Sequence, residues 1–140
     1  MSYEVFNLSI CKGEGEITVL IVDDEQDILN LLAEDLVEMD KSIGVILANT
    51  GYSALQCIQE RSIDLLLTDI AMPDMDGHEL YQRTIDIRPD MAVIMMTGFG
   101  YDPNHVLLNS KKIGLTNTIY KPFDISKLYK MINEVLGRNV

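Results

Sequence analysis

Short apolar runs alternate with longer amphipathic stretches along most of the chain. Five runs have the continuous apolar character of buried strands, and they cover residues 17–22, 45–48, 64–69, 91–97 and 117–120. Between them, apolar residues recur at spacings of three and four, which is the period of a helix. Strands that are buried on both faces and separated by helices belong to parallel sheets. The pattern therefore predicts an α/β fold: one doubly wound, five-stranded parallel sheet flanked by five helices.

The apolar positions that recur at helical spacing mark the individual helices. In the first helix these positions are Ile28, Leu31, Leu32, Leu36 and Met39. In the second they are Ala54, Leu55 and Ile58. Further helices are expected over 78–87, which ends before Pro89, and over 103–112. Asp124 or Ser126 would cap the last helix, whose predicted buried face is formed by Leu128, Met131, Ile132, Val135 and Leu136.

Length and composition fit one domain. The chain has 140 residues, 47% of them hydrophobic, which is enough for one core and too few for two ordinary domains. A Gly-Glu-Gly breaker separates an N-terminal extension or linker, residues 1–16, from the predicted domain at 17–140. No apolar run approaches the roughly 20 residues that span a bilayer, and the first residues lack an export signal. We therefore expect a cytoplasmic protein with no membrane partner.

The formal net charge of −11 argues against direct nucleic-acid binding, because acidic surfaces repel phosphate backbones. The charge is unevenly distributed: residues 1–82 carry 17 acids and 3 bases, whereas residues 83–140 carry 5 acids and 8 bases. Chance unevenness on a solvated surface is one explanation. The other is that the last two helices contact an acidic partner or a second copy of the chain, which would form a homodimer.

Charged and hydroxyl side chains stand where the predicted strands end. The first strand is followed by Asp23 and Asp24, the third ends in Asp69, the fourth in Thr97, and the fifth is followed by Lys121. Each has an ordinary structural explanation taken alone, such as a helix cap for Asp24 or a solvated loop charge for Lys121. The carboxyl ends of parallel strands meet at one edge, however, and ligands bind there. Together these residues predict a functional site.

Three carboxylates that share one edge repel one another, so the site requires cations. A pair of like charges about 4 Å apart costs about 4 kcal/mol at an effective dielectric constant of 20. Oxygen ligands without His or Cys suit Mg²⁺, for which Mn²⁺ can substitute. Lys121 adds a compact positive charge and Thr97 a hydrogen-bond donor, where a phosphoryl group would lie. The residues predict phosphoryl transfer onto a carboxylate.

The segments VLIVDDE, DLLLTDIAMPDMDGHEL, VIMMTG and YKPF, in this order and at these distances, resemble the receiver domains of two-component response regulators, the group that includes the chemotaxis regulator. The resemblance covers about residues 17–138 and implies the flavodoxin-like receiver fold. It implies that Asp69 is the phospho-acceptor and Thr97 the switch hydroxyl. Lys121 would contact the phosphoryl group. The implied ligands of Mg²⁺ are Asp23, Asp24, Asp69 and the backbone carbonyl of Ala71.

The resemblance also implies a mechanism and partners. Asp69 would take a phosphoryl group from a phosphohistidine of a sensor histidine kinase or a histidine phosphotransfer domain. The new acyl phosphate would draw Thr97 inward and change the surface that a downstream protein target reads. Such a domain is a signalling element rather than an enzyme, since it catalyses only its own phosphorylation and dephosphorylation. In the loop after Asp69, Gly77 is expected to permit a left-handed turn, and Met72 and Met75 to pack in the core.

The chain departs from the family pattern at some positions. Thr118 stands where the family usually has the aromatic residue that moves on activation, so this chain lacks a swinging ring at that position. Ala71 and Phe99 occupy two positions that influence access of water to the acyl phosphate, and neither carries a polar side chain. Slow self-dephosphorylation is therefore expected. The alternative function is a phosphorylation-independent protein-docking module with the receiver fold, which Thr118 supports slightly.

Overall fold

A computed structural model of the chain describes residues 16–98 and 117–138. The strands are β1 (Ile17–Val22), β2 (Ile43–Ala48), β3 (Leu65–Asp69), β4 (Ala92–Thr97) and β5 (Thr118–Tyr120). The helices described are α2 (Gln26–Met39), α3 (Gly51–Glu60), α4 (Gly77–Ile87) and α6 (Ile125–Leu136). These elements confirm the predicted alternation. The helix expected over 103–112 lies outside the described residues. None of the described helices combines the length and the apolar character needed to cross a bilayer.

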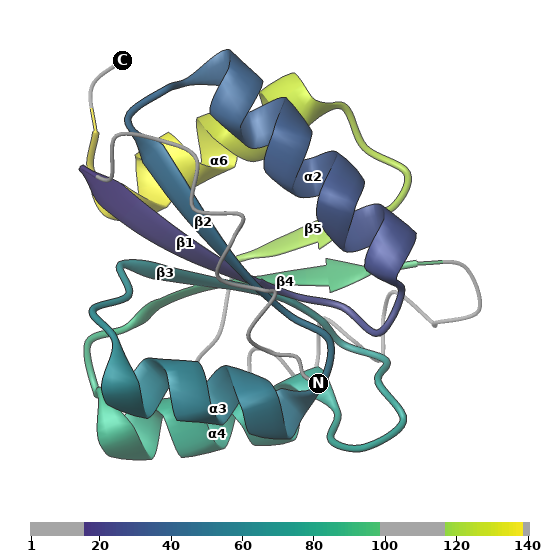
Figure 1. Cartoon of the computed structure of the whole chain (residues 1–140), viewed down its shortest axis with the longest axis vertical. Coiled ribbons are helices and arrows are strands. Elements are labelled where there is room, and N and C mark those ends of the chain that lie inside the picture. The colour runs from purple at the N-terminus through teal and green to yellow at the C-terminus, as the bar shows by residue number, and fades with distance from the viewer. Residues whose placement is uncertain (1–15, 99–116, 139–140) are drawn as a thin grey trace.

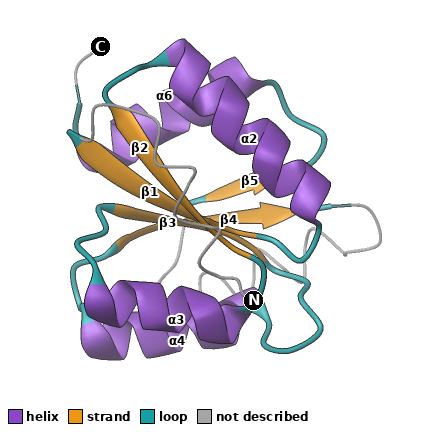
Figure 2. Ribbon diagram, viewed as in Figure 1, coloured by secondary structure: helices purple, strands orange, loops and turns teal. Residues whose placement is uncertain are grey.

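The strands form one sheet in the order β2-β1-β3-β4-β5, and every pairing is parallel. Figure 1 shows α2 and α6 on one face of this sheet and α3 and α4 on the other. The helices in purple and the strands in orange in Figure 2 form three layers, as predicted for a doubly wound fold. The chain leaves β1 toward β2 and returns to the other side of β1 as β3. The strand order therefore reverses between β1 and β3.

Each face of the sheet has its own hydrophobic core, because alternate side chains of a strand point to opposite faces. On β1, Val19 and Ile21 belong to the core beneath α2 and α6, whereas Leu20 and Val22 belong to the core beneath α3 and α4. All four side chains are fully buried. Burying a side chain of this size contributes roughly 1.5–3 kcal/mol relative to leaving it exposed. The two cores hold the strand ends at fixed positions.

The buried face of α2 includes only part of the apolar repeat that predicted this helix. Its buried residues are Leu29, Leu32, Ala33, Leu36 and Val37. Two members of that repeat lie outside the buried face: Leu31 is 58% exposed and Met39 is 40% exposed. Apolar residues cover more than half of this helix, so spacing alone does not show which part faces the sheet. The prediction for α6 holds better, since Leu128 and Ile132 are buried and Met131, Val135 and Leu136 pack partly buried against the same core.

The loop from β3 to α4 passes close to the end of β3, and Gly77 makes this approach possible. A Cβ on Gly77 would lie 2.8 Å from the carbonyl oxygen of Asp69 and 2.9 Å from Cα of Ile70. The expected left-handed turn at Gly77 was wrong, because Gly137 is the glycine with positive φ in the part of the chain described. Gly77 is required by space rather than by backbone angle. Met72 and Met75 are buried, as predicted.

Two contacts join α3 to α4, one near each end. At the start of α3, the Gly51 N–H donates to Asp74 Oδ2 at 2.9 Å from the loop that precedes α4. At its end, Arg88 Nη2 donates to the carbonyls of Ile58 and Arg61 at 2.9 and 2.8 Å. These carbonyls have no partner within the helix, and a cation at a helix C-terminus also interacts favourably with the helix dipole. The two helices are therefore fixed to each other at both ends.

A polar cluster at the amino edge of the sheet joins α6 to the turn between α2 and β2. Asp40 accepts hydrogen bonds from the Ser42 N–H and hydroxyl at 2.9 and 2.7 Å, from Tyr129 at 2.8 Å and from Arg138 at 3.1 Å. The pKa of Asp40 is lowered, first by the Ser42 hydroxyl, against the opposing effect of burial, and further by Tyr129 and Arg138. The carboxylate form of Asp40 is thus part of the fold.

We predict that Gly77→Ala destabilises the fold by about 1–3 kcal/mol, because a methyl group there overlaps backbone atoms that cannot move aside. Gly98→Ala is the matched control, since the nearest heavy atoms to its added Cβ are ordinary contacts at 3.7 and 3.9 Å. Urea unfolding of the two variants and the wild type measures the difference. Equal free energies of unfolding for the two variants would contradict the close approach described here.

We also predict that Asp40→Asn flattens the acid side of the stability profile. A carboxyl group with a lowered folded-state pKa stabilises the fold above its unfolded-state pKa of about 3.9, and this contribution is lost as the pH falls through the folded-state value. The wild type should therefore lose stability below about pH 4 more steeply than Asp40→Asn. Urea unfolding between pH 2 and pH 7 tests this, with the exposed Asp86→Asn as control. A variant profile parallel to that of the wild type would refute it.

Candidate phosphorylation site

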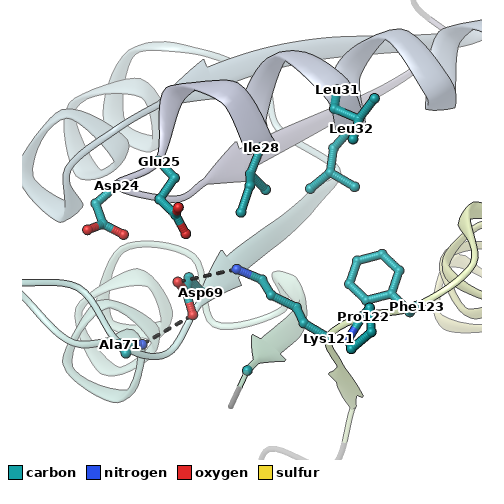
Figure 3. Close-up of a pocket in the computed structure, with 11 residues that line it drawn as sticks. Asp24, Glu25, Ile28, Leu31, Leu32, Asp69, Ala71, Lys121, Pro122 and Phe123 are labelled. Carbon is teal, nitrogen blue, oxygen red and sulfur yellow. Dashed lines mark hydrogen bonds and ion pairs between the residues drawn. The ribbon is translucent and has the colours of Figure 1, made fainter. Parts of the chain in front are cut away.

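The residues predicted from the strand ends lie at one edge of the sheet. Asp23 follows β1, Asp69 ends β3, Thr97 ends β4 and Lys121 follows β5. This is the carboxyl edge, at the point where the strand order reverses between β1 and β3. Figure 3 shows the ammonium of Lys121 reaching across toward Asp69, with Asp24 facing the same space from the start of α2. The structure thus brings the predicted side chains together.

Lys121 is bonded to two carboxylates in the site. Its Nζ lies 2.8 Å from Asp23 Oδ2 and 3.5 Å from Asp69 Oδ2. Asp23 is fully buried, and its other oxygen accepts the Glu25 N–H at 3.0 Å. A buried carboxylate is stable only when it is paired and hydrogen-bonded. Asp23 satisfies both conditions, whereas Asp69 has the longer and weaker contact with the ammonium.

The pKa of Asp69 is raised. Burial is the largest cause, and the negative charge of Asp23 adds to it, while Lys121 and the Ala71 N–H act in the opposite direction. For Lys121, burial lowers the pKa, but the hydrogen bond and charge of Asp23, together with Asp69, outweigh burial, so its pKa is raised. Lys121 therefore stays protonated at neutral pH. Of the two carboxylates that contact Lys121, Asp69 is the one whose negative charge is less well compensated.

Three carboxylates could share one cation. One oxygen each from Asp23, Asp24 and Asp69 lie within 4.8 Å of one another. Asp24 is exposed, so solvent reaches this group from one side. Carboxylate oxygens with access to water are the ligands that Mg²⁺ prefers, because it retains several waters when bound. The backbone N–H of Ala71 donates to Asp69 Oδ1 at 3.3 Å. The role of the Ala71 carbonyl as a further ligand stays a prediction.

Two buried hydroxyl groups, one at the end of β4 and one at the start of β5, have unused hydrogen-bonding capacity. Thr97 is 2% exposed, and its Oγ1 has no hydrogen-bond partner; the buried Oγ1 of Thr118 has none either. The backbone carbonyl of Thr97 accepts the Lys121 N–H at 2.6 Å, which fixes β4 against the residue that follows β5. A buried polar group without a partner costs about 1–3 kcal/mol. Both hydroxyls would gain a bond from an acceptor that reached them.

A cavity of about 720 Å³ opens beside Asp69, and sequence analysis did not predict it. Its polar end contains Asp24, Glu25, Asp69 and Lys121, and its apolar wall is formed by Ile28, Leu31, Leu32, Pro122 and Phe123. The wall comes from α2 and from the loop that follows β5 (Figure 3). One feature of the sequence could have indicated this cavity: Leu31 is an apolar residue that lies outside the buried face of α2. Phe99, expected to shield the phosphoryl group, lies outside the described residues. So does the helix expected over 103–112, one of the two helices proposed for a homodimer; the other is α6, and the dimer stays a prediction.

Comparison with known proteins identifies relatives along most of the chain. Residues 19–133 match the family described as the response regulator receiver domain. The response regulator receiver protein CpdR of Brucella abortus is 32% identical over 121 residues, which cover 84% of this chain and 95% of that protein. A receiver domain protein (CheY-like) from Methanospirillum hungatei has a crystal structure that matches with a TM-score of 0.77 and 33% identity, covering 86% of this chain and 94% of that one.

Longer proteins also match over the same region. The transcriptional regulatory protein GlrR of Escherichia coli is 30% identical over 121 residues, which cover 86% of this chain and 26% of that protein. The chain thus spans about a quarter of the length of the first curated relatives it matches. The chain belongs to the response regulator receiver domain family, whose members are signalling domains of two-component systems.

Proposed function

We propose that Asp69 accepts a phosphoryl group from the phosphohistidine of a histidine kinase or a histidine phosphotransfer domain. The observation that carries this proposal is the position of Asp69. Its carboxylate has incomplete charge compensation, lies 3.5 Å from the ammonium of Lys121 and lines an open cavity. A carboxylate in this setting is a nucleophile that a donor can reach. Family membership supports the same role.

The chemistry proposed is a single displacement at phosphorus. A carboxylate oxygen of Asp69 forms a bond to phosphorus, while the bond from phosphorus to the imidazole nitrogen of the donor breaks. The imidazole leaves with the electron pair of the broken bond, and it leaves as a neutral ring when its other nitrogen already carries a proton in the donor. Lys121 holds a positive charge beside the transferred oxygens throughout, because its pKa is raised. The product is an acyl phosphate on Asp69.

The site fits a bound Mg²⁺ or Mn²⁺, because three carboxylates converge and one ammonium compensates only part of their charge. Asp23, Asp24 and Asp69 would hold the ion, with the Ala71 carbonyl as a further ligand. When bound, the ion would supply positive charge to the phosphoryl oxygens. Lys121 keeps its ion pair with Asp23, which orients the ammonium across the site.

The cavity wall suits the surface of a donor protein. Ile28, Leu31 and Leu32 on α2 face Pro122 and Phe123 across the opening. Leu31 is 58% exposed, so a donor that covered it would gain roughly 25 cal/mol for each Å² of apolar surface removed from water. The wall lies next to Asp69. A partner seated there would bring its phosphohistidine to the nucleophile.

Thr97 would transmit the phosphorylation of Asp69 to the surface of the domain. An acyl phosphate on Asp69 adds three acceptor oxygens, and the Thr97 hydroxyl has no partner to give up before it binds one of them. Movement of Thr97 would displace the end of β4 and change the surface beyond it. Thr118 stands in β5 where an aromatic residue is usual, so the movement would be transmitted without a ring. A downstream protein would read the changed surface.

We predict a single phosphoryl adduct when the protein is incubated with a small phosphodonor and Mg²⁺. Intact mass spectrometry should detect it in the wild type and in Asp76→Asn, which keeps a capping side chain at the start of α4. It should be absent from Asp69→Ala and Asp69→Asn, and from the wild type without a divalent cation. Folded protein that gives no adduct under any of these conditions would favour the phosphorylation-independent docking module.

We further predict that Asp69→Asn is more stable than the wild type by about 1–3 kcal/mol at pH 7 without metal, because it removes a buried, incompletely paired charge. A carboxyl group with a raised folded-state pKa destabilises the fold above that value. The difference should therefore shrink as the pH falls toward the unfolded-state pKa of about 3.9. Mg²⁺ should stabilise the wild type and have little effect on the variant.

Urea unfolding at pH 4 and pH 7, with and without Mg²⁺, measures these effects. Asp64→Asn is the control, since Asp64 is a carboxylate on the opposite edge of the sheet that accepts the Thr18 N–H at 2.7 Å. A wild type that is as stable as Asp69→Asn at pH 7, and that Mg²⁺ does not stabilise, would contradict the assignment of the acidic cluster as a cation site.

A further inference from the structure

Glu25 is a third consecutive acid whose carboxylate has no structural role in the described part of the chain. It occupies the N-cap position of α2, but its side chain does not cap the helix. In contrast, Thr50 caps α3 and Asp76 caps α4 with side-chain oxygens. The Glu25 carboxylate forms no ion pair with the described cations, because Lys121 is bonded to Asp23 and Asp69. The side chain is therefore available to the site.

The Glu25 carboxylate lies in the cavity beside the nucleophile. Figure 3 shows it pointing from the start of α2 toward the space between Asp69 and Lys121, next to Asp24. It lines the same cavity as these residues, so a phosphodonor that approaches Asp69 passes it. It is exposed, so its effect on an incoming charge acts through partly screened electrostatics.

The sum of the formal charges in the site shows the electrostatic effect of Glu25. The carboxylates of Asp23, Asp24 and Asp69 are balanced in number by the ammonium of Lys121 and one divalent cation, if the proposed function is correct. Glu25 is the fourth carboxylate and leaves the mouth of the cavity with one negative charge in excess. Phosphodonors are themselves anions, and like charges at the mouth slow their approach.

We infer that Glu25 is a specificity residue that selects among phosphodonors by their charge. This inference rests on the proposed function. It disfavours small donors that carry two negative charges. It favours a donor that brings positive charge beside its phosphoryl group, as a protein can do with a Lys or Arg next to its phosphohistidine. The residue thus protects Asp69 from metabolites of the acyl phosphate class while leaving it open to a kinase.

Two small donors of different charge test this inference. Acetyl phosphate is a dianion at neutral pH, and its transfer forms the Asp69 O–P bond, breaks the P–O bond and releases acetate. Phosphoramidate carries a net single negative charge because its nitrogen is protonated, and its transfer breaks the P–N bond and releases ammonia. Rates of adduct formation are measured by intact mass with Mg²⁺ saturating for each variant, at low and high salt.

The matched control for Glu25→Gln is Asp27→Asn, which removes the same charge from the same helix. Asp27 is an exposed acid in the first turn of α2 and does not line the cavity. Glu25→Gln should raise the rate with acetyl phosphate about two- to fivefold at low salt, and the rate with phosphoramidate by less. High salt should remove the difference. Asp27→Asn should leave both rates near those of the wild type.

A second measurement does not depend on phosphoryl transfer. Inorganic phosphate is titrated into the Mg²⁺-loaded protein and its affinity is followed by NMR chemical shifts. Glu25→Gln should bind phosphate about two- to fivefold more tightly than the wild type or Asp27→Asn. Equal affinities, together with rates that rise equally for both donors or not at all, would overturn the inference while the Asp69 adduct still supports the proposed function. Absence of the adduct in every variant would overturn both.

Discussion

The ion pair between Lys121 and Asp23 is the interaction on which the site depends. It spans 2.8 Å and joins the residue that follows β5 to the residue that follows β1, across the ends of the two strands between them. Without the ammonium, the fully buried Asp23 would be an uncompensated charge, which costs several kcal/mol. The pair therefore permits an acidic edge on a hydrophobic sheet. It also leaves Asp69 with the weaker share of the positive charge.

The strands, and the residues that stand at their carboxyl ends, could be predicted from the sequence. Continuous apolar runs indicate strands buried on both faces, and the acids, hydroxyl and lysine that end them meet because all the strands run parallel. The convergence of Asp23, Asp69, Thr97 and Lys121 could thus be predicted from spacing. The depth of burial of each side chain could not, because it depends on how the helices lie over the sheet.

The features that were not predicted correctly from the sequence share one kind of physical cause. Leu31 belongs to the apolar repeat of α2 and yet is exposed, because a helix in which more than half of the residues are apolar does not reveal its buried face. Gly77 was assigned to a left-handed turn, since a glycine in a loop has the same appearance whether it serves a backbone angle or a close approach. Glu25 was not singled out, because the helix dipole favours an acid at a helix start and its presence there needs no functional explanation. Each case required knowledge of what lies opposite the residue.

The two hydrogen-bonded connections between α3 and α4 restrict how these helices can move relative to each other. Asp74 holds the first turn of α3, and Arg88 holds its last carbonyls, so the pair cannot splay or slide without breaking a hydrogen bond. Asp74 lies in the loop that begins at Asp69 and ends at Gly77. A displacement of this loop would therefore act on both helices, because Asp74 links the loop to α3 and the loop runs directly into α4. On their face of the sheet the two helices thus form one hydrogen-bonded surface that begins at the loop after Asp69.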